Sequence, residues 1–252
     1  MNNGNVKIVG AGPGEKDLIT VKGLKAIRKA NAILYDALVN TDLLKEARSD
    51  AQLIYVGKRA GAHSSTQDEI NLLLLQSALS HENVVRLKGG DPFIFGRGQE
   101  EIEYLKNFGV DVEVIPGISS VTALPALQKI PLTRRGIAES FWVMTGTTSY
   151  GTLSEDIKLG VKSSATLVVL MGIGKMAQIA DLLIEEGKAN VPIMIIQNGS
   201  LSDEKIVIGS ARSIVDDMKV KKIGTPGIIV IGEVVSLHPE FILEKCESWI
   251  NQ

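Results

Sequence analysis

Short apolar runs rich in β-branched residues recur along this chain of 252 residues and alternate with longer segments of helical spacing. Runs of this kind are typical of buried strands, and strands that alternate with helices form α/β folds. The sequence therefore predicts an α/β protein with strands at residues 6–9, 32–35, 53–56, 84–87, 112–115, 141–144, 166–171, 193–196, 206–208 and 228–231.

Two kinds of signal mark the ends of helices between these runs. Thr66 is followed by Glu69 and then by an apolar series, which is the pattern of a capping box at a helix N-terminus. Gly109 and Gly187 stand where a glycine commonly follows the last turn of a helix. We expect helices that begin and end at these positions.

The alternating pattern breaks at residues 129–136, with about five strand candidates on each side. We therefore expect two α/β domains, at residues 1–131 and 132–252. Domain interfaces and the carboxyl ends of strands are common ligand sites in such folds, so we expect a cleft between the domains. The first domain would supply glycine-rich loops and catalytic groups, and the second would complete the site.

Composition narrows the possible functions. A formal net charge of −2 gives no excess of basic residues for a nucleic-acid surface. Cys246 is the only cysteine and the three histidines lack ligand spacing, so we expect neither disulfides nor a metal site. The N-terminus lacks a signal-peptide pattern, and the longest apolar runs are about half of the roughly 20 residues that span a membrane. We expect a cytoplasmic protein with a small-molecule substrate.

The stretch VVRLKGGDPFIFGRG at residues 84–98 places four glycines and several charges directly after a strand. Gly89 and Gly90 allow backbone N–H groups to approach a ligand, and Asp91 adds an acceptor. The planar fork of Arg97 suits a carboxylate. An ordinary glycine turn is the alternative interpretation, but the surrounding residues favour a binding loop.

The first glycine-rich turn, VGAGPG at residues 9–14, invites a dinucleotide-binding interpretation. It departs from that fingerprint because Glu15 replaces the third glycine and Pro13 lacks a backbone donor. Asp36 follows the second strand and imitates a ribose-binding acid, so a nicotinamide site remains an alternative. A ligand that needs no phosphate cradle fits this turn better.

Several motifs occur together in one order. They are VGAGPG at 9–14 with Leu18, Thr20 and Gly23, YD at 35–36, VGKRAG at 56–61, the loop at 84–98 and PGISS at 116–120, followed by weaker matches LMG at 170–172, NG at 198–199 and TPG at 225–227. In these motifs the chain resembles the tetrapyrrole methylase family, and within it the members that methylate uroporphyrinogen III.

The resemblance implies a class III S-adenosylmethionine-dependent methyltransferase with two α/β domains that works as a homodimer. The implied reaction methylates C2 and C7 of uroporphyrinogen III and gives precorrin-2, which feeds siroheme and cobalamin synthesis, together with S-adenosylhomocysteine. The chain has no room for the dehydrogenase and ferrochelatase portion of fused siroheme synthases, so we expect it to stop at methylation.

Site residues carry over by their positions in the matching motifs. The implied cofactor contacts are Pro13, Gly89, Gly90, Asp91, Ile94, Ser119, Ser120, Met171, Gly199, Pro226 and Gly227. The implied substrate contacts are Arg97, Glu100, Arg135 and again Met171. The family's proton acceptor and donor fall on Asp36 and Lys58.

The chemistry of a carboxylate-rich macrocycle agrees with this choice of residue types. Arginine matches a carboxylate in charge and plane, so Arg59, Arg97, Arg134 and Arg135 are candidate partners, although each also fits a solvated surface. The other roles have plain alternatives too. Asp36 also fits a helix cap, Lys58 an exposed strand end and Met171 a core position.

Three positions differ from the common family pattern: Gln99 stands in place of a glycine, Arg134 in place of a histidine and Ser200 in place of a threonine. These differences leave the placement of the substrate open. Two further hypotheses also stay open, namely a methylase of the same fold that acts on a later corrin precursor and a non-catalytic metabolite sensor.

Overall fold

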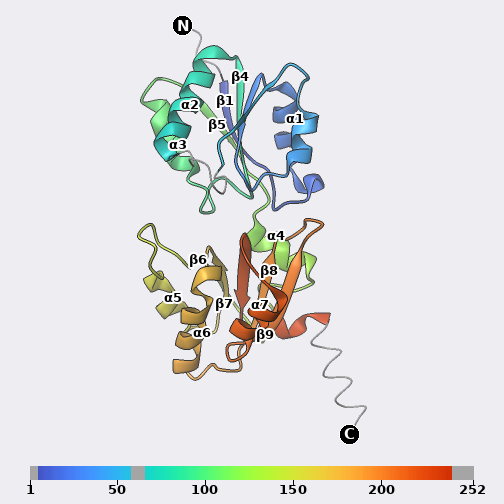
Figure 1. The fold of residues 1–252 in the computed structure, drawn as a ribbon, viewed down its shortest axis with the longest axis vertical. Coiled ribbons are helices and arrows are strands. Elements are labelled where there is room, and N and C mark those ends of the chain that lie inside the picture. The colour runs from blue at the N-terminus through green and yellow to red at the C-terminus, as the bar shows by residue number, and fades with distance from the viewer. Residues whose placement is uncertain (1–4, 58–65, 240–252) are drawn as a thin grey trace. The chain divides into compact units, whose positions relative to one another are not determined.

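The computed structural model describes residues 5–57 and 66–239. The chain divides into two compact units, Met1–Ser120 and Val121–Gln252. Each contains one five-stranded sheet with helices, so the expected α/β class with about five strands per domain is confirmed (Figure 1).

The sheet of the first unit is entirely parallel, in the order β3-β2-β4-β1-β5. Its strands are β1 (Asn5–Gly10), β2 (Ala32–Tyr35), β3 (Gln52–Tyr55), β4 (Asn83–Lys88) and β5 (Val112–Ile115). The helical elements of this unit are η1 (Lys16–Leu18), α1 (Val21–Lys29), η2 (Thr41–Glu46), α2 (Gln67–Ser80) and α3 (Gly98–Lys106).

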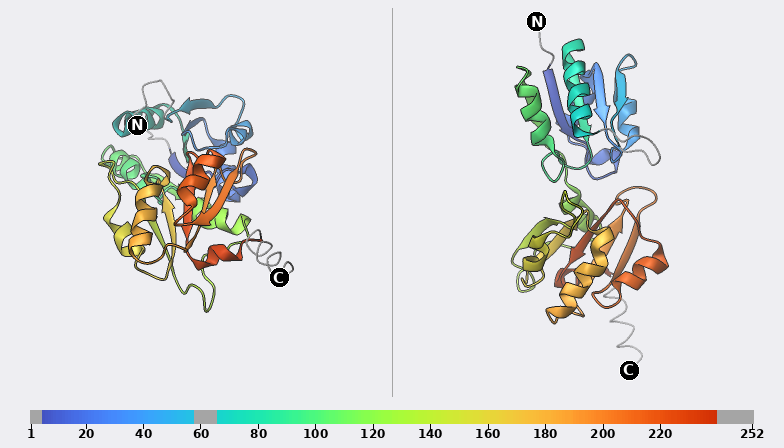
Figure 2. Two further views of the ribbon diagram at one scale, coloured as in Figure 1. Left: turned by 60° about the horizontal axis from the view of Figure 1, so that its bottom comes forward. Right: turned by 60° about the vertical axis from the view of Figure 1, so that its left-hand side comes forward.

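Alternation along the strands places apolar side chains on both faces of this sheet. Ala32 and Leu34 of β2 pack in one core cluster with residues of α2 and α3, whereas Ile33 packs in another with residues of α1 and η2. Helices therefore cover both faces, as Figures 1 and 2 show. Strands buried on both faces are typical of parallel sheets.

The second unit has a mixed sheet in the order β6-β7-β10-β8-β9. Its strands are β6 (Phe141–Thr145), β7 (Thr166–Leu170), β8 (Pro192–Gln197), β9 (Lys205–Ser210) and β10 (Gly227–Ile231). β6 and β7 are parallel, while β10 runs antiparallel to both β7 and β8, and β8 runs antiparallel to β9. The amino end of β10 therefore lies beside the carboxyl ends of β7 and β8.

Helices also cover both faces of the second sheet. One face packs against α5 (Glu155–Gly160), α6 (Met176–Glu185) and α7 (Ile214–Lys221). The other packs against α4 (Ser120–Leu127) and η4 (Glu233–Leu237), and η3 (Ile173–Lys175) follows β7. Leu124 and Ile130 are buried in this second cluster, so residues 121–131 pack with the second unit. The two compact units thus divide between residues 120 and 121, and the domain boundary expected between residues 131 and 132 stays a prediction.

The strand pattern of the sequence is confirmed throughout. Each expected strand is present within two residues of its expected ends. The capping box is formed as expected, with Thr66 Oγ1 accepting from Glu69 N at 3.2 Å and Glu69 Oε2 accepting from Thr66 N at 2.7 Å. Gly109 and Gly187 both have positive φ after helices. Within residues 5–57 and 66–239, no helix has the length and hydropathy to cross a membrane.

Candidate functional site

The carboxyl ends of β1 and β4 form the natural ligand position of the first sheet. These strands are neighbours, yet β1 leads to α1 on one face of the sheet and β4 leads to α3 on the other. Connections that depart to opposite faces leave a crevice at the carboxyl edge, where ligands bind in open parallel sheets. The two glycine-rich segments chosen from the sequence both begin here.

Four glycines join the loops at this edge. A Cβ on Gly117 would lie 2.2 Å from Gly90 O and 2.6 Å from Gly10 Cα, closer than real Cβ atoms approach. Gly12 pairs with Gly90 through two backbone hydrogen bonds, of 3.3 and 2.7 Å. Since Pro13 follows Gly12, its segment and the Gly89–Gly90 segment lie side by side, beside the turn that leads to Ser119 and Ser120.

Asp91 ties two of these loops together. Its Oδ1 accepts a hydrogen bond from Phe93 N at 2.8 Å, and its Oδ2 accepts one from Gly117 N at 3.1 Å. The side chain therefore organises the loop backbone, which is compatible with the predicted cofactor contact but does not test it. Ile94, in the same loop, is 41% exposed and available for a ligand.

The turn after β1 does not form a phosphate cradle at a helix N-terminus. η1 separates the glycines from α1, and the N-cap of α1 is already filled because Thr20 Oγ1 accepts from Gly23 N at 3.1 Å. The physical basis of the dinucleotide alternative, a free helix N-terminus directly after the glycines, is therefore missing from this turn.

Asp36 stands at the carboxyl end of β2 and is held at both oxygens. Oδ1 accepts from Leu38 N at 3.0 Å, and Oδ2 lies 3.5 Å from Nη2 of Arg86. The side chain is 24% exposed, so this carboxylate faces a buried cation and still reaches solvent. Gly89 lies close by, since a Cβ there would be 2.6 Å from Cβ of Leu38. Lys58 and Arg59 lie outside the described residues.

Arg97 and Glu100, two predicted substrate contacts, bind each other. Arg97 Nε donates to Oε1 at 2.8 Å and Nη2 donates to Oε2 at 2.6 Å, a bidentate pair in which both side chains are about half exposed. The hydrogen bond from Arg97 lowers the pKa of Glu100, and the same bond raises the pKa of Arg97. Arg97 thus already presents its planar fork to a carboxylate, which is the recognition mode expected for the substrate.

A buried charge cluster behind Asp36 was not found by sequence reasoning. Glu101 of α3 is fully buried, and its Oε1 accepts from Arg86 Nε at 3.1 Å and from Lys88 Nζ at 2.8 Å. Burial, and then the charge of Arg86, lowers the pKa of Lys88. Oε2 of Glu101 has no hydrogen-bond partner among the described residues. Two charged residues inside a buried strand were the available signal, because β4 has little room for charges unless they are paired.

In the second unit, the predicted contacts meet at one edge of the sheet. Leu170, which precedes Met171, pairs with Ile228 next to Gly227, and Asn198 N donates to Pro226 O at 3.1 Å beside Gly199. The structure therefore brings together Met171, Gly199, Pro226 and Gly227. A Cβ on Gly199 would lie 2.4 Å from a methyl group of Leu124, so a larger residue there would require the buried Leu124 side chain to shift.

Unusual backbone conformations concentrate in these loops. Met171, Asn198 and Ser200 have φ values of 54°, 50° and 64°, and Phe95 and Arg97 have φ values of 55° and 58°. Left-handed conformations are unfavourable for residues other than glycine and gather at functional sites. Met171 is also 51% exposed, so the core interpretation of this residue is wrong.

Arg135 lies in the second unit, at an exposed turn. An antiparallel bridge between Arg134 and Ala138 closes the turn, and Gly136 N donates to Glu139 Oε1 at 3.1 Å. Both arginines are exposed. Their side chains are free to bind a ligand carboxylate or to remain solvated, so their assignment stays a prediction.

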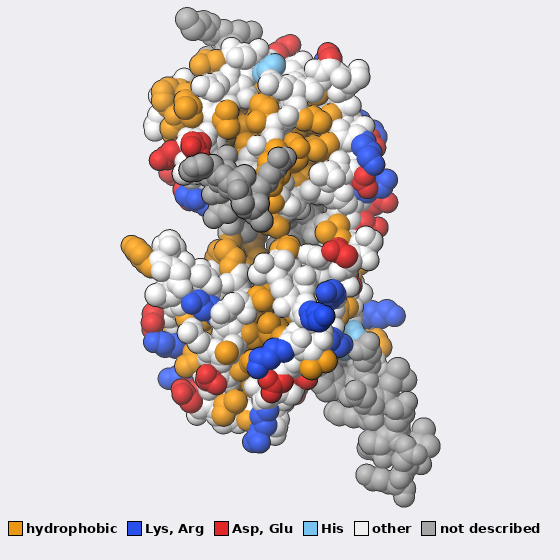
Figure 3. Space-filling model, in the orientation of Figure 1, with side chains coloured by type: hydrophobic (Ala, Val, Ile, Leu, Met, Phe, Trp, Pro, Cys, Tyr) orange, Lys and Arg blue, Asp and Glu red, His pale blue; other side chains and the backbone are white. Residues whose placement is uncertain are grey.

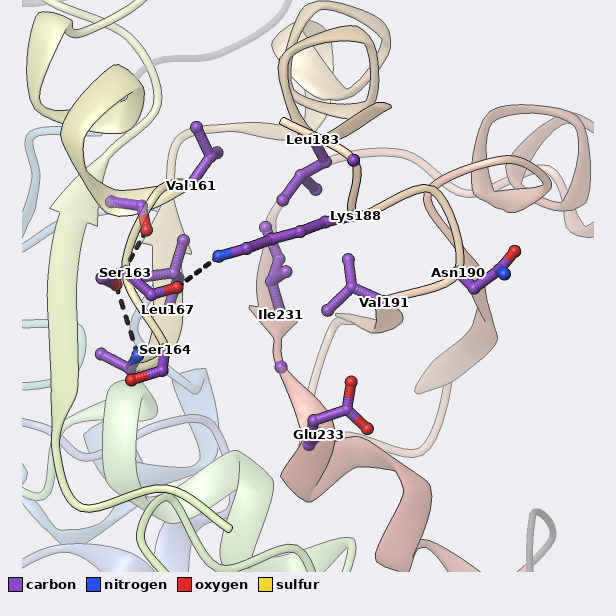
Figure 4. Close-up of a pocket in the computed structure, with 14 residues that line it drawn as sticks. Val161, Ser163, Ser164, Leu167, Leu183, Lys188, Asn190, Val191, Ile231 and Glu233 are labelled. Carbon is purple, nitrogen blue, oxygen red and sulfur yellow. Dashed lines mark hydrogen bonds between the residues drawn. The ribbon is translucent and has the colours of Figure 1, made fainter. Parts of the chain in front are cut away.

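A separate cavity of about 340 Å³ lies at the opposite end of the second sheet, before β7 and after β10. Figure 4 shows Lys188 reaching across it to Ser163, whose carbonyl oxygen accepts a hydrogen bond from Lys188 Nζ at 2.5 Å. None of the predicted site residues lines this cavity. The cavity and the left-handed residues of the second unit therefore lie at opposite ends of the second sheet.

Comparisons with known proteins identify the family. The model of the tetrapyrrole (corrin/porphyrin) methylases matches residues 5–215. The chain belongs to this family. It is 44% identical over 236 residues to the uroporphyrinogen-III C-methyltransferase of Methanocaldococcus jannaschii. The matched region covers 93% of this chain and 98% of the relative.

Fused relatives and solved structures agree with this family. The siroheme synthase of Sodalis glossinidius is 41% identical over the whole chain, which spans 52% of that longer protein. Uroporphyrin-III C-methyl transferase from Thermus thermophilus, solved in complex with S-adenyl homocysteine, superposes with a TM-score of 0.79 at 37% identity over 93% of this chain and 100% of that one. The resemblance inferred from the motifs is thereby confirmed.

Proposed function

We propose that this chain transfers methyl groups from S-adenosylmethionine to C2 and C7 of uroporphyrinogen III, giving precorrin-2 and S-adenosylhomocysteine. The observation that carries the proposal is the joined set of loops at the carboxyl ends of β1, β4 and β5, with the carboxylate of Asp36 at the neighbouring end of β2. The near full-length similarity to a uroporphyrinogen-III C-methyltransferase supports the choice of substrate.

The loops fit the methyl donor. Gly90 has a φ of 65°, and a Cβ built on it would face open space, with only Ser120 N within 4.0 Å. An exposed backbone edge beside the half-exposed Ile94 offers hydrogen-bonding groups and an apolar surface, which an adenosine and a methionine portion require. The predicted contacts Pro13, Gly89, Gly90, Asp91, Ser119 and Ser120 would line this edge, and Met171, Gly199, Pro226 and Gly227 would add contacts from the second unit.

The chain's own part in the reaction is positioning and proton removal. When bound, S-adenosylmethionine supplies an electrophilic methyl group. An electron-rich pyrrole carbon of the substrate attacks that group, so a C–C bond forms, the C–S bond breaks and sulfur keeps the electron pair. The macrocycle then loses a proton, and Asp36 would be its acceptor, a role that its ordered and partly exposed carboxylate supports. Lys58 is the predicted donor partner. Holding the reactants in line supplies most of the remaining rate.

Arg97 would hold the substrate through a carboxylate. Its fork is already preformed on Glu100, so a substrate carboxylate would replace or share that partner. The assignments of Arg97, Glu100 and Arg135 as substrate contacts remain predictions of the family motif.

Activity with defined substrates tests the proposal. The purified protein is incubated anaerobically with S-adenosylmethionine carrying a labelled methyl group and with uroporphyrinogen III, and the products are identified by mass spectrometry. A dimethylated product supports the proposal. Methylation of only a later corrin precursor would favour the related methylase, and binding of both ligands without turnover would favour the sensor.

A homodimer in the cytoplasm is the assembly and location that the family resemblance implies. Figure 3 shows apolar side chains at the surface of the first unit, and Leu53, Leu72 and Leu79 are between 46% and 58% exposed. Exposed apolar patches commonly mark interfaces, which supports association. Light scattering during size-exclusion chromatography tests the dimer, and a monomer at micromolar concentration would contradict it.

A further inference from the structure

We infer that Glu101 is a positioning residue for the methyl-transfer reaction. It acts by holding Arg86 in place against Asp36. The inference rests on the proposed function and on Asp36 as proton acceptor. It goes further in giving a role to a residue that contacts neither ligand in the assignments above.

The charges of the Glu101 cluster are buried, which costs free energy of folding. The side chains of Glu101, Arg86 and Lys88 are 0%, 3% and 6% exposed. Removing such charges from water is expensive, and apolar residues of similar volume often give equal or greater stability. Packing of β4 against α3 therefore does not by itself require charged groups here.

The guanidinium of Arg86 is held at all three nitrogens. Nε donates to Glu101 Oε1 at 3.1 Å, Nη1 donates to Leu87 O at 2.9 Å, and Nη2 lies 3.5 Å from Asp36 Oδ2. The first two contacts fix the plane of the group. The third is then determined, because a planar fork held at two points has a fixed third direction.

Glu101 is the part of this arrangement that can be removed without touching the site. Asp36 is 24% exposed and faces the carboxyl edge, whereas Glu101 lies wholly inside the first unit. Its second oxygen lacks a partner among the described residues, so the carboxylate is retained for its bonds through Oε1. Oε1 accepts a long bond from Gln67 Nε2 at 3.5 Å and shorter bonds from Arg86 and Lys88. Of these two cations, Arg86 is the one that is paired with Asp36.

A double-mutant cycle tests this role. Glu101→Gln keeps the shape of the side chain but removes its charge, and we expect kcat to fall about tenfold, a part of the hundredfold or more that a positioned base contributes. The KM for the tetrapyrrole and the affinity for S-adenosylhomocysteine should stay within about twofold, because neither ligand contacts Glu101. In an Asp36→Asn background, Glu101→Gln should change the residual kcat by less than about twofold, because Glu101 affects the reaction only through Asp36.

Two further variants keep the test decisive. Glu103→Gln, on the exposed side of the same helix, removes an equal charge and should leave kcat unchanged. If Glu101→Gln does not fold, Lys88→Met combined with Glu101→Gln restores the charge balance of the cluster and should show the same loss of kcat.

The outcomes separate the possibilities. A tenfold loss in the Asp36→Asn background as well would show that Glu101 acts independently of Asp36 and would overturn the inference, as would a wild-type kcat for Glu101→Gln. Absence of methyl transfer by the wild-type protein would overturn the proposed function and the inference together, and that result is distinguishable because it precedes any mutation.

Discussion

Replacing Gly117 with alanine should damage the first unit and its predicted cofactor edge together. The added Cβ would lie 2.2 Å from Gly90 O, and real Cβ contacts essentially never fall below 3.0 Å, so one loop must move by about 0.8 Å. Gly10 Cα at 2.6 Å blocks the other direction. Overpacking of this kind costs about 2–3 kcal/mol.

The displaced loop carries Gly89 and Gly90, so ligand affinity should fall with stability. We expect the Kd for S-adenosylhomocysteine to rise about tenfold, which corresponds to about 1.4 kcal/mol. Urea unfolding measures the first effect and titration calorimetry the second. Gly174→Ala is the matched stability control, because a Cβ there meets no atom within 4 Å. If Gly117→Ala kept wild-type affinity and lost less than about 0.5 kcal/mol, the close approach of the loops would be refuted.

The remaining predictions concern substrate binding, pH and capping. Arg97→Ala should weaken uroporphyrinogen binding about tenfold, since a charged hydrogen bond is worth about 1.5–3 kcal/mol, and leave cofactor affinity unchanged. Arg28→Ala, which breaks an exposed pair at the end of α1 in which Nε and Nη2 both donate to Glu46 Oε2, should change neither. Hydrogen bonds from two lysines lower the pKa of Glu113 to about 2, so Glu113→Gln should cost about 1 kcal/mol at pH 7 after allowance for solvent screening. Thr66→Ala should cost about 1 kcal/mol through the lost cap, without affecting ligand affinity.

The pH dependence of the Glu113 variant follows from the sign of its shift. A carboxyl group with a lowered pKa stabilises the folded state above its unfolded value near 4.5, and this stabilisation is lost as the pH falls from 4.5 towards 2. Wild type and variant should therefore differ in unfolding free energy at pH 7 and converge at pH 2, as denaturation at each pH would measure. A constant difference would contradict the ion pair. If Arg97→Ala lowered the affinity for both ligands equally, the role given to Arg97 would be contradicted. If Thr66→Ala weakened ligand binding, the role given to Thr66 would be contradicted.

Strand positions were predictable because each strand is a short apolar run. Apolar residues that are buried on both sheet faces leave no polar interruption in Ala32–Tyr35, so the ends of this strand are visible in the sequence alone. Strand order was not predictable in the same way. The antiparallel course of β10 between β7 and β8 depends on pairing between distant segments, which local composition does not record.

The candidate site was predictable where it relies on glycine and hidden where it relies on burial. Gly89 and Gly90 stand out because their residue type is a backbone requirement. Glu100 and Glu101 are identical neighbours in the sequence, yet one pairs with an exposed arginine and the other is buried beneath the strands. A helix turns by about 100° per residue, so only the orientation of α3 on the sheet decides which glutamate faces inward.

A structure of the protein with S-adenosylhomocysteine bound would show whether the loops at the carboxyl ends of β1 and β4 hold the methyl donor. We predict that the ligand contacts the backbone of Gly90 and Ile94, that Met171 and Gly199 contact the same ligand molecule, and that Asp36 faces the sulfur side of the site. A ligand bound in the cavity beside Lys188, or one that touches neither Gly90 nor Gly199, would contradict it.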